Sequence, residues 1–505
     1  MTTLREKINN KPWLGWLIFI ATVVVVFLLG LLASSIIERR AEAQFAYTPQ
    51  VKLSEFEPRN EEWGKNFPRE YQSYMQTLDT SFSSKYNGNA WVDMLEEDPR
   101  MVVLWAGYSF SRDYNQGRGH AYAIQDIREI LRTGAGPLDG ENEIQPNTCW
   151  TCKGPDVPRV MNNIGVAEFY SGKWSSLGAE IVNPIGCADC HDPVTMNLRI
   201  TRPALIEAFE RQGKDITEAS HQEMRSLVCA QCHVEYYFKG KGEYLTFPWD
   251  EGRSAEEMEE YYDNYEFADW THSMSRAPML KAQHPDYEVF MTGIHADRGV
   301  ACSDCHMPYI NEGGMKFADH HVRSPLDNVA NTCQVCHREE TETLIANVYE
   351  RQDQIIGNRN QLEKLIVRAH TEAQKAWELG ASESEMEEIL TAIRHAQWRW
   401  DYCAATHGGS FHSPTEVSRV IGTAIDIIQE GRIKLARLLL KKGYEGEVPY
   451  PPIDTKADAQ KFIGLDMDKL RAEKQLFLET VVPKWDEIAA QRHESWGSTM
   501  ISDIR

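Results

Sequence analysis

Positive charge is scarce in this sequence. Its 505 residues include 53 lysines and arginines against 75 aspartates and glutamates, a formal net charge of −22. We therefore expect no nucleic-acid partner, because phosphate binding needs a basic surface. An anionic substrate would need a local positive region to overcome this global field. Cysteine is nearly absent outside one repeated pattern. Sequence patterns typical of β-strands are also scarce, so the sequence predicts a mainly α fold.

Ten of the eleven cysteines occur in pairs that are separated by two residues. The pairs are, in chain order, Cys149/Cys152, Cys187/Cys190, Cys229/Cys232, Cys302/Cys305 and Cys333/Cys336. Lys153 follows the first pair, and His191, His233, His306 and His337 follow the other four. Cys-x-x-Cys-His attaches c-type haem: two thioethers hold the porphyrin and the adjacent imidazole ligates the iron. Chance would produce on the order of 0.01 such motifs in a chain of this composition.

Zinc sites and disulfides are the rival interpretations of these pairs. Zinc ribbons use two Cys-x-x-Cys pairs at regular spacing and need no histidine at the next position. Disulfide frameworks belong to small secreted domains. An odd number of widely spaced pairs in a long chain fits neither, so we predict five covalent c-type haems. Cys403 stands apart and is expected to be a buried apolar side chain.

The N-terminal segment lacks charge from Trp13 to Ile37, a run of 25 residues. This run is long enough to span a bilayer with some tilt, and lysines before it favour a cytoplasmic N-terminus. The alternative is a cleaved signal peptide, because residues 41–43 (Ala-Glu-Ala) have the form of a cleavage site. We expect a retained signal anchor over residues 1–43. Either outcome places the bulk of the protein outside the cytoplasm.

The rest of the chain divides at about residue 338. Residues 44–338 contain all five motifs among turn-rich sequence and form the predicted pentahaem region, in which the chain wraps the porphyrins. Residues 339–505 have long apolar periodicities, with a helix expected from Glu339 to about Leu379. Ser382 and Glu385 form a capping box for a second helix to about His407, and Pro414 begins a third to Lys442. These helices could cover the haems, form a dimer interface, or both, within one globular domain.

Twelve histidines lie outside the motifs, and low-spin haems need four of them as second axial ligands. The candidates in turn-rich sequence or at the end of the tryptophan-rich helix are His120, His295, His320, His321, His407 and His412. The histidines in polar helical sequence, expected to be solvated, are His221, His370, His395 and His493.

Three patterns together resemble the pentahaem cytochrome c nitrite reductases, which form ammonia. They are the lysine motif beside four histidine motifs, residues 131–135 (Leu-Arg-Thr-Gly-Ala) and residues 397–401 (Gln-Trp-Arg-Trp-Asp). The resemblance runs from about residue 60 to the C-terminus. It implies an active site at the haem of Lys153 and four bis-histidine haems that relay electrons.

The resemblance also implies individual residues. Distal ligands would be His320, His120, His412 and His295 for the second to fifth motifs; the substrate pocket would hold Arg132, Tyr236 and His284; calcium would be bound by Glu235, Gln283 and the carbonyls of Tyr236 and Lys281. Two ligands have close alternatives. The spacing to Cys333 favours His320 over His321, and the family's His-x-Pro context favours His412 over His407.

The predicted reaction is the six-electron, eight-proton reduction of nitrite to ammonium in the periplasm. Arg132 would bind nitrite oxygens, and His284 and Tyr236 would supply protons and hydrogen bonds. The family implies a membrane-bound multihaem quinol dehydrogenase as donor, and a homodimer is expected. One alternative is an electron-transfer cytochrome without its own substrate, which would need every iron capped on both sides. Another alternative is a multihaem enzyme that works oxidatively, but nothing in the sequence indicates this class.

Overall fold

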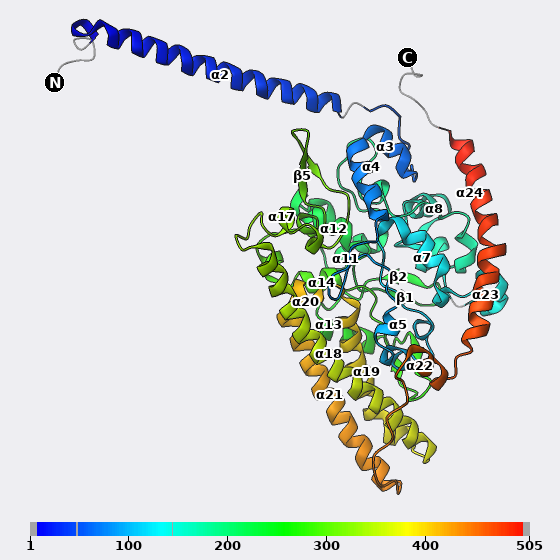
Figure 1. Ribbon diagram of the computed structural model, residues 1–505. Helices are drawn as coiled ribbons and strands as arrows, with labels where there is room; N and C mark the ends of the chain where they lie inside the picture. Colours follow the sequence, from blue (N-terminus) through cyan, green and yellow to red (C-terminus); the bar gives the residue numbers. More distant parts are fainter. Residues whose placement is uncertain (1–7, 47–48, 144, 498–505) are drawn as a thin grey trace.

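A computed structural model describes residues 8–46, 49–143 and 145–497, and it confirms the mainly α class. Figure 1 shows a body of short helices and loops, three long helices extending from it, and one helix that projects away. The helices of the body are α3 (Asn60–Asn66), α4 (Pro68–Met75), α5 (Met94–Glu97), α6 (Arg100–Leu104), α7 (Ala123–Glu129), α8 (Asp156–Ile164), α9 (Val166–Tyr170), α10 (Cys187–Cys190), α11 (Pro203–Arg211), α12 (His221–Ala230), α13 (Ala255–Asn264), α14 (Asp286–Phe290), α15 (Ile294–Asp297), α16 (Cys302–His306), α17 (Val329–Thr332) and α20 (Gly409–His412).

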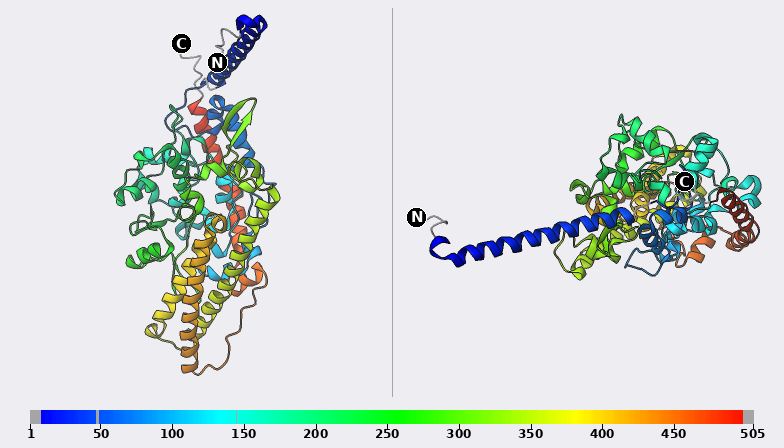
Figure 2. Two further views of the ribbon diagram at one scale, coloured as in Figure 1. Left: turned by 90° about the vertical axis from the view of Figure 1, so that its left-hand side faces the viewer. Right: turned by 90° about the horizontal axis from the view of Figure 1, so that it is seen from above.

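The projecting helix, α2 (Pro12–Ala46), contains the predicted apolar span. Its segment Pro12–Glu38 is long and apolar enough to cross a membrane, and none of that segment is buried inside the protein. Figure 2 shows it leaving the body in both views. The helix runs three residues past the predicted boundary at 43. The basic residues Arg5 and Lys7, which bear on its orientation, lie outside the described residues.

The three predicted long helices are present as α18 (Thr341–Glu378), α19 (Glu383–Ala405) and α21 (Pro414–Lys441). The Ser382 hydroxyl accepts a hydrogen bond from the Glu385 N–H, and the Ser382 N–H donates to the Glu385 carboxylate, so the predicted capping box is confirmed. Apolar faces hold the three helices together, with Ile366 on α18, Ile393 on α19 and Ile428 on α21 fully buried. They pack on one another, and α18 also packs on α6, one of the short helices of the body.

The prediction that His370 is solvated is wrong. Its side chain on α18 is fully buried, with Nδ1 2.9 Å from Ser275 Oγ and Nε2 2.7 Å from Gln397 Oε1. The ring stacks on His272 at a centroid distance of 3.6 Å. A polar helical context is a poor guide here, because the partners come from distant parts of the chain.

Within the residues that the structure describes, the strands form three antiparallel pairs: β1 (Tyr237–Lys239) with β2 (Tyr244–Thr246), β3 (Trp270–Thr271) with β4 (Pro278–Met279), and β5 (Tyr309–Glu312) with β6 (Met315–Ala318). The register places Tyr237 opposite Thr246. β1 begins directly after Tyr236, and β4 ends two residues before Lys281. These short pairs therefore anchor two segments of the site described below.

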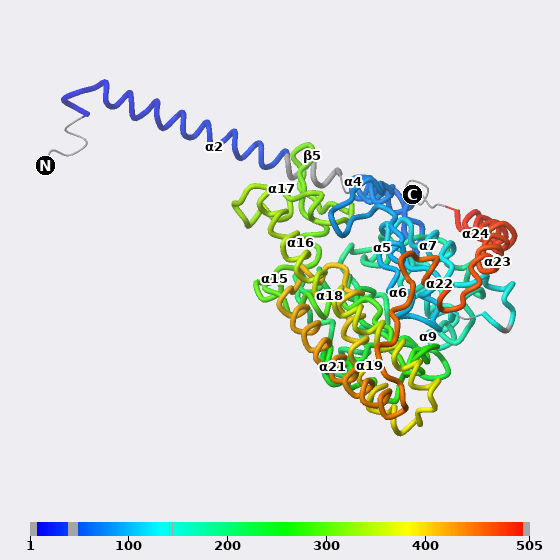
Figure 3. The backbone as a smooth tube through the Cα atoms, turned by 60° about the horizontal axis from the view of Figure 1, so that its bottom comes forward, coloured from blue at the N-terminus to red at the C-terminus, as the bar shows by residue number. Residues whose placement is uncertain are grey.

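A C-terminal arm follows the long helices and consists of α22 (Lys456–Phe462), α23 (Met467–Thr480) and α24 (Val482–Trp496). Figure 3 shows it returning along the body beside α5, α6 and α7. The residues predicted only as a further helical stretch thus pack against the N-terminal part of the body.

Candidate active site

The lysine motif is packed rigidly into the body. A single 3₁₀ turn, Asn147–Trp150, begins it, and the Lys153 N–H extends this turn by donating to the Trp150 carbonyl at 2.9 Å. Trp150 is fully buried, stacks on Trp174 at 4.9 Å, and donates from Nε1 to the Trp174 carbonyl at 2.8 Å. The tryptophan between the two cysteines therefore fixes the direction in which Cys152 and Lys153 leave the backbone.

Arg202 holds the same segment from the other side. Its guanidinium donates to the carbonyls of Thr151 at 2.7 Å and Gly154 at 3.0 Å, and it pairs with Asp189, all within the interior. A Cβ at Gly154 would lie 1.9 Å from the Asn183 carbonyl oxygen, so glycine is required after the lysine. Sequence reasoning missed Arg202, since an isolated arginine carries no local pattern.

Two motif histidines have a defined tautomer. His191 Nδ1 lies 2.9 Å from the Met196 carbonyl, and His306 Nδ1 lies 2.9 Å from the Arg323 carbonyl. A carbonyl only accepts, so Nδ1 carries the proton and Nε2 keeps a free lone pair. This is the form in which imidazole ligates a metal, with its second nitrogen held by the surrounding protein.

Each motif histidine faces a second imidazole. The ring centroids are 6.2 Å apart for His191 and His320, 6.5 Å for His233 and His120, 6.2 Å for His306 and His412, and 6.3 Å for His337 and His295. Two imidazoles that share one metal through bonds of about 2 Å would have centroids about 6 Å apart. Burial lowers the pKa of His120, His191 and His412 to about 4, so these rings are neutral near pH 7. The donor set and its spacing fit bis-histidine haem.

The two alternative histidines lie elsewhere. His321 is 5% exposed, and neither of its ring nitrogens has a hydrogen-bond partner, whereas its neighbour His320 is the one that faces His191. His407 packs edge-on against His284 at 4.9 Å. The geometry therefore favours His320 and His412 as the ligands.

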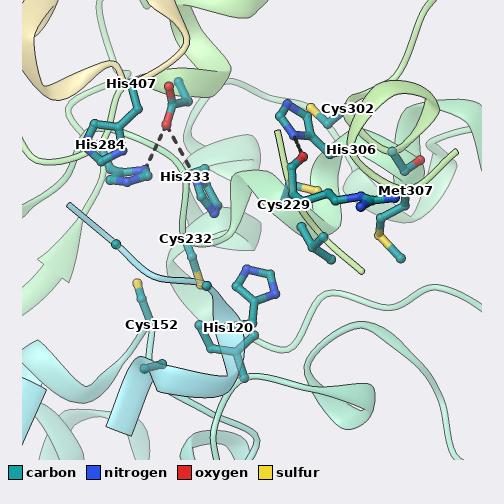
Figure 4. A pocket seen from close by; sticks show the side chains of 18 of the residues that line it. His120, Cys152, Cys229, Cys232, His233, His284, Cys302, His306, Met307 and His407 are labelled. Atoms are coloured by element: carbon teal, nitrogen blue, oxygen red, sulfur yellow. Dashed lines mark hydrogen bonds and ion pairs between the residues drawn. The ribbon is translucent and has the colours of Figure 1, made fainter. Parts of the chain in front are cut away.

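All five motifs contribute to the lining of one cavity of about 1600 Å³. The lining includes Cys152 and Cys232, whose thiols interact although they belong to the first and third motifs, and Cys229 and Cys302 of the third and fourth motifs interact in the same way. Figure 4 shows these cysteines with the imidazoles of His120 and His233 between the two groups. A cavity of this size lined by cysteine pairs and imidazoles fits several adjacent haems.

Cys336 of the fifth motif is not enclosed by the chain. Cys333 lines the cavity, whereas Cys336 lies outside the lining and is the one motif cysteine that is exposed. The motif follows the short helix α17 at the surface of the body, where Val335 is 67% exposed and about half of the His337 side chain is also exposed. The chain therefore wraps this motif on one side only. A haem attached through Cys333 and Cys336 would lie at the edge of the protein, with Cys336 on the solvent side.

Cys149 also lies outside the cavity lining, but for a different reason. Its thiol points to Gln145, with Sγ 3.1 Å from Oε1, and burial raises the Cys149 pKa to about 12. This cysteine is the first residue of the lysine motif, and the body largely encloses it. Cys149 is only partly exposed, whereas Cys336 is exposed.

Comparison with known proteins assigns the chain to a family. The cytochrome c552 family model matches residues 59–493, most of the chain. The chain belongs to the cytochrome c552 family. Haem bound through Cys-x-x-Cys motifs is accordingly its cofactor, as the sequence predicted.

Relatives of known sequence and structure agree with this assignment. Cytochrome c-552 of Porphyromonas gingivalis is 60% identical over 476 residues, which cover 94% of this chain and 96% of the relative. Cytochrome c-552 of Bacteroides thetaiotaomicron is 58% identical over 482 residues, or 95% and 97% of the two chains. The solved cytochrome c nitrite reductase of Desulfovibrio desulfuricans matches with a TM-score of 0.72 and 31% identity, covering 83% of this chain and 91% of that one. The protein is therefore an oxidoreductase of the cytochrome c nitrite reductase type.

In this member of the cytochrome c552 family, the three predicted substrate residues line the same cavity as the lysine. Arg132 lies on the turn Leu131–Thr133, with its guanidinium carbon 4.5 Å from the centre of the Phe110 ring. Tyr236 precedes β1, and burial raises its pKa well above 10, so the phenol stays protonated. His284 packs edge-on against His233 at 4.5 Å, and burial lowers its pKa. A cation, a hydroxyl donor and an imidazole thus share one space.

The predicted calcium residues also lie together. Glu235 is fully buried and accepts hydrogen bonds from the Tyr262 hydroxyl at 2.8 Å and the Gln283 N–H at 2.7 Å. The Gln283 amide reaches the Lys281 carbonyl at 3.2 Å, and the Tyr236 carbonyl follows Glu235 directly. Burial raises the Glu235 pKa well above its usual range, and within the described chain no basic side chain pairs with it. Oxygen ligands around a buried carboxylate without a counter-ion fit a calcium site.

Asp286 is a further member of the site that the sequence analysis did not identify. Its Oδ2 lies 3.1 Å from His284 Nδ1 and 3.5 Å from His233 Nδ1. The dashed lines in Figure 4 mark these two contacts. Its place two residues after His284 was the available signal, because a carboxylate commonly holds the second nitrogen of a functional imidazole.

Proposed function

We propose that the protein reduces nitrite to ammonium, with six electrons and eight protons consumed and two waters released, at the haem of the Lys153 motif. When bound, haem would supply an iron that binds nitrite and the electrons for its reduction. The roles of the protein side chains follow from their positions in the cavity.

Lys153 is the proposed proximal ligand. A neutral amine offers a single lone pair, so Lys153 would hold the haem iron through one bond. Trp150 and Arg202 hold the motif backbone from two sides, which keeps the Lys153 amine in register with Cys149 and Cys152. Arg132, Tyr236 and His284 then face the substrate.

Arg132 is the proposed anion receptor. A guanidinium forms two parallel hydrogen bonds and remains charged at every working pH, which suits the two oxygens of nitrite. The protein as a whole repels anions, with its net charge of −22, so a fixed local cation is needed at the site. Stacking on Phe110 at 4.5 Å restricts the movement of the Arg132 side chain.

His284 and Tyr236 are the proposed proton donors. The Asp286 carboxylate beside Nδ1 favours a proton on that nitrogen and directs Nε2 of His284 away from it. An imidazole held in this way can take protons from water and pass them on near neutral pH. The protonated Tyr236 hydroxyl adds a second hydrogen-bond donor.

A calcium ion is proposed to bind to the side chains of Glu235 and Gln283 and to the carbonyls of Tyr236 and Lys281. The Desulfovibrio relative has two calcium sites in its catalytic subunit. A divalent cation at Glu235 would compensate that buried carboxylate and fix the backbone of Tyr236, Gln283 and the adjacent His284. It would also add positive potential for an entering anion.

The four histidine motifs are proposed to relay electrons. Contacts between Cys152 and Cys232, and between Cys229 and Cys302, support an order in space from the first motif to the third and then the fourth. The fourth and fifth motifs are also neighbours, since Cys333 acts electrostatically on Cys305. A close row of haems can store and deliver the six electrons that a single iron cannot.

The location and partners follow from the same proposal. α2 would anchor the protein on the periplasmic side of the inner membrane, where a membrane-bound multihaem quinol dehydrogenase would donate electrons. Exposed apolar side chains on α21, including Ile433 and Leu440, would support a homodimer. The three segments 1–43, 44–338 and 339–505 would then be the anchor, the pentahaem region, and the long-helix region that covers it.

The asymmetry of the five motifs is the observation that carries the proposal. Four histidine motifs each face a second imidazole at 6.2–6.5 Å, whereas the first motif has Lys153 in place of the histidine. Arg132, Tyr236 and His284 line the cavity that all five motifs share. An electron-transfer cytochrome without its own substrate would not need an arginine, a tyrosine and a histidine placed to bind one.

Stoichiometric turnover tests the proposal. The purified holoprotein is given nitrite and a known quantity of reduced viologen, and ammonium is measured. We expect one ammonium per six electrons consumed. Viologen that stays reduced, with no ammonium formed, would favour the electron-transfer cytochrome; nitric oxide or hydroxylamine as the main product would contradict the six-electron assignment.

A further inference from the structure

The turn that carries Arg132 is held at several points. The Leu131 N–H donates to Asp113 Oδ2 at 3.2 Å, and the Ala135 N–H donates to Asp139 Oδ2 at 2.7 Å. The Gln145 amide donates to the Arg132 carbonyl at 3.2 Å. The turn is one 3₁₀ unit long, so it has little stability of its own, and these outside contacts set where the guanidinium points.

Lys474 on α23 reaches this turn from the C-terminal arm. Its Nζ donates to the Arg128 carbonyl at 3.0 Å and to Thr133 Oγ1 at 3.1 Å. The Thr133 hydroxyl donates its own proton toward the carbonyls of Ile127 and Ile130, both at 2.9 Å, so its oxygen is free to accept from the lysine. Lys474 therefore connects the two ends of the segment that positions Arg132.

The lysine is an unusual choice for this position. It is 4% exposed and lies over the rings of Phe477 at 4.9 Å and Trp174 at 6.0 Å. Across the part of the chain that the structure describes, no carboxylate comes within ion-pair distance of its Nζ. Burial lowers the Lys474 pKa to about 7, although the carboxylates of Asp139 and Asp113 oppose this shift. A methionine would fill the same space without the cost of burying an amine, so the hydrogen bonds to the turn are what the lysine adds.

The rest of the C-terminal arm acts on the same region. Lys456 pairs with Asp93 at 2.5 Å, and Gln460 donates to the Ser111 and Arg112 carbonyls at 3.2 and 3.0 Å. The Arg128 guanidinium pairs with Asp486 of α24 at 2.8 Å. Figures 1 and 3 show α22 beside α5, and α23 and α24 on the side of the body that carries α7. Contacts from all three arm helices thus converge on the segment that leads to Arg132.

We propose that Lys474 is a positioning residue for the substrate: it holds the Leu131–Thr133 turn so that the Arg132 guanidinium meets nitrite. This inference rests on the proposed role of Arg132. Without the two hydrogen bonds of Lys474, the turn keeps its other contacts but loses the connection between Arg128 and Thr133, and the guanidinium shifts relative to the bound anion. Nitrite affinity falls, while haem attachment and electron delivery are unaffected.

A double-mutant cycle tests this coupling. Lys474→Met, Arg132→Ala and the double variant are prepared as holoproteins with the haem content checked by mass. Nitrite affinity is measured by optical titration of the oxidised protein, and kcat and KM by viologen oxidation. We expect Lys474→Met to weaken nitrite binding about tenfold in the wild-type background and less than about twofold when Arg132 is already alanine.

Lys469→Met is the matched control, because it removes the same charge from an exposed position on the same helix. It should leave affinity unchanged. If Lys474→Met fails to assemble, Thr133→Val, which removes the acceptor of one hydrogen bond, takes its place in the cycle and should show the same dependence on Arg132.

The outcomes separate the two hypotheses. Equal losses in both backgrounds, or no loss in either, would overturn the positioning role of Lys474. An Arg132→Ala protein with normal nitrite affinity would instead refute the proposed function of Arg132, and the positioning inference would fall with it.

Discussion

Acid should destabilise this protein through one pair of stacked imidazoles. His272 and His370 are fully buried, with ring planes 11° apart and centroids 3.6 Å apart. Each is hydrogen-bonded as a neutral ring: His272 Nε2 lies 2.8 Å from the Val103 carbonyl, and His370 Nε2 lies 2.7 Å from Gln397 Oε1. Burial lowers the pKa of His370 from 6.5 to about 4, and it lowers the pKa of His272 well below 6.5. A proton on either ring would face the other ring directly.

The sign and size of the change in the free energy of unfolding follow from proton linkage. Between pH 6.5 and 4 the unfolded chain binds more protons than the folded protein, so stability that is present above pH 6.5 is lost as the pH falls. One pKa unit corresponds to about 1.4 kcal/mol, so His370 alone should cost about 2 kcal/mol at pH 5 and about 3 kcal/mol at pH 4. His272 adds to this loss in the same direction. Iron-bound histidines cannot take up protons in this way while they remain ligands.

Unfolding of the holoprotein by guanidinium, followed between about pH 4.5 and 7.5, measures the effect. His370→Asn should unfold at a lower denaturant concentration at pH 7, because the buried ring is lost, but its stability should fall less steeply with acid. His221→Asn, at an exposed position, should keep the wild-type slope. A His370→Asn protein with the wild-type slope would refute the reasoning.

Three further predictions concern the cofactors, the membrane and the substrate. The mass of the protein should exceed that of its polypeptide by five haems; an excess of four would show that the lysine motif is not loaded. The protein should stay in the membrane fraction after washing with high salt and carbonate, whereas an N-terminus at Gln44 would show cleavage before the body. Arg132→Ala and His284→Ala should keep all five haems but lower nitrite turnover on the order of a hundredfold, His284→Ala with release of partly reduced nitrogen species. Near-normal ammonium formation would remove these residues from the mechanism.

The parts of the structure that could be predicted are those encoded locally. Each Cys-x-x-Cys motif is contiguous, and the long helices follow from apolar periodicity, so α18 and α21 begin and end within about two residues of prediction. The cap at Ser382 needs only Glu385 three residues on. The uncharged run in α2 is equally visible in sequence.

The parts that could not be predicted depend on contacts between distant segments. His370 was expected to be solvated because its helical neighbours are polar, yet Ser275 and Gln397 enclose it. Arg202 and Lys474 each act on a turn far away in sequence, and their own surroundings give no sign of it. The histidine partners were identified by resemblance to a family, since the histidines outside the motifs carry no pairing pattern of their own.

The exposure of Cys336 belongs to the same class of features. Its motif has the same local sequence form as the three other histidine motifs, so nothing in the motif itself distinguishes an edge position from an enclosed one. The difference arises because no other segment of the described chain covers the solvent side of this turn, as the exposure of the neighbouring Val335 also shows.

The central claim is that one haem, held by Lys153, is open to substrate while the other four are closed by histidine. Electron paramagnetic resonance of the oxidised holoprotein, before and after addition of nitrite, tests it most directly. We expect one high-spin haem among four low-spin haems, and a change in the high-spin signal alone when nitrite is added. Five low-spin haems that do not respond to nitrite would contradict it.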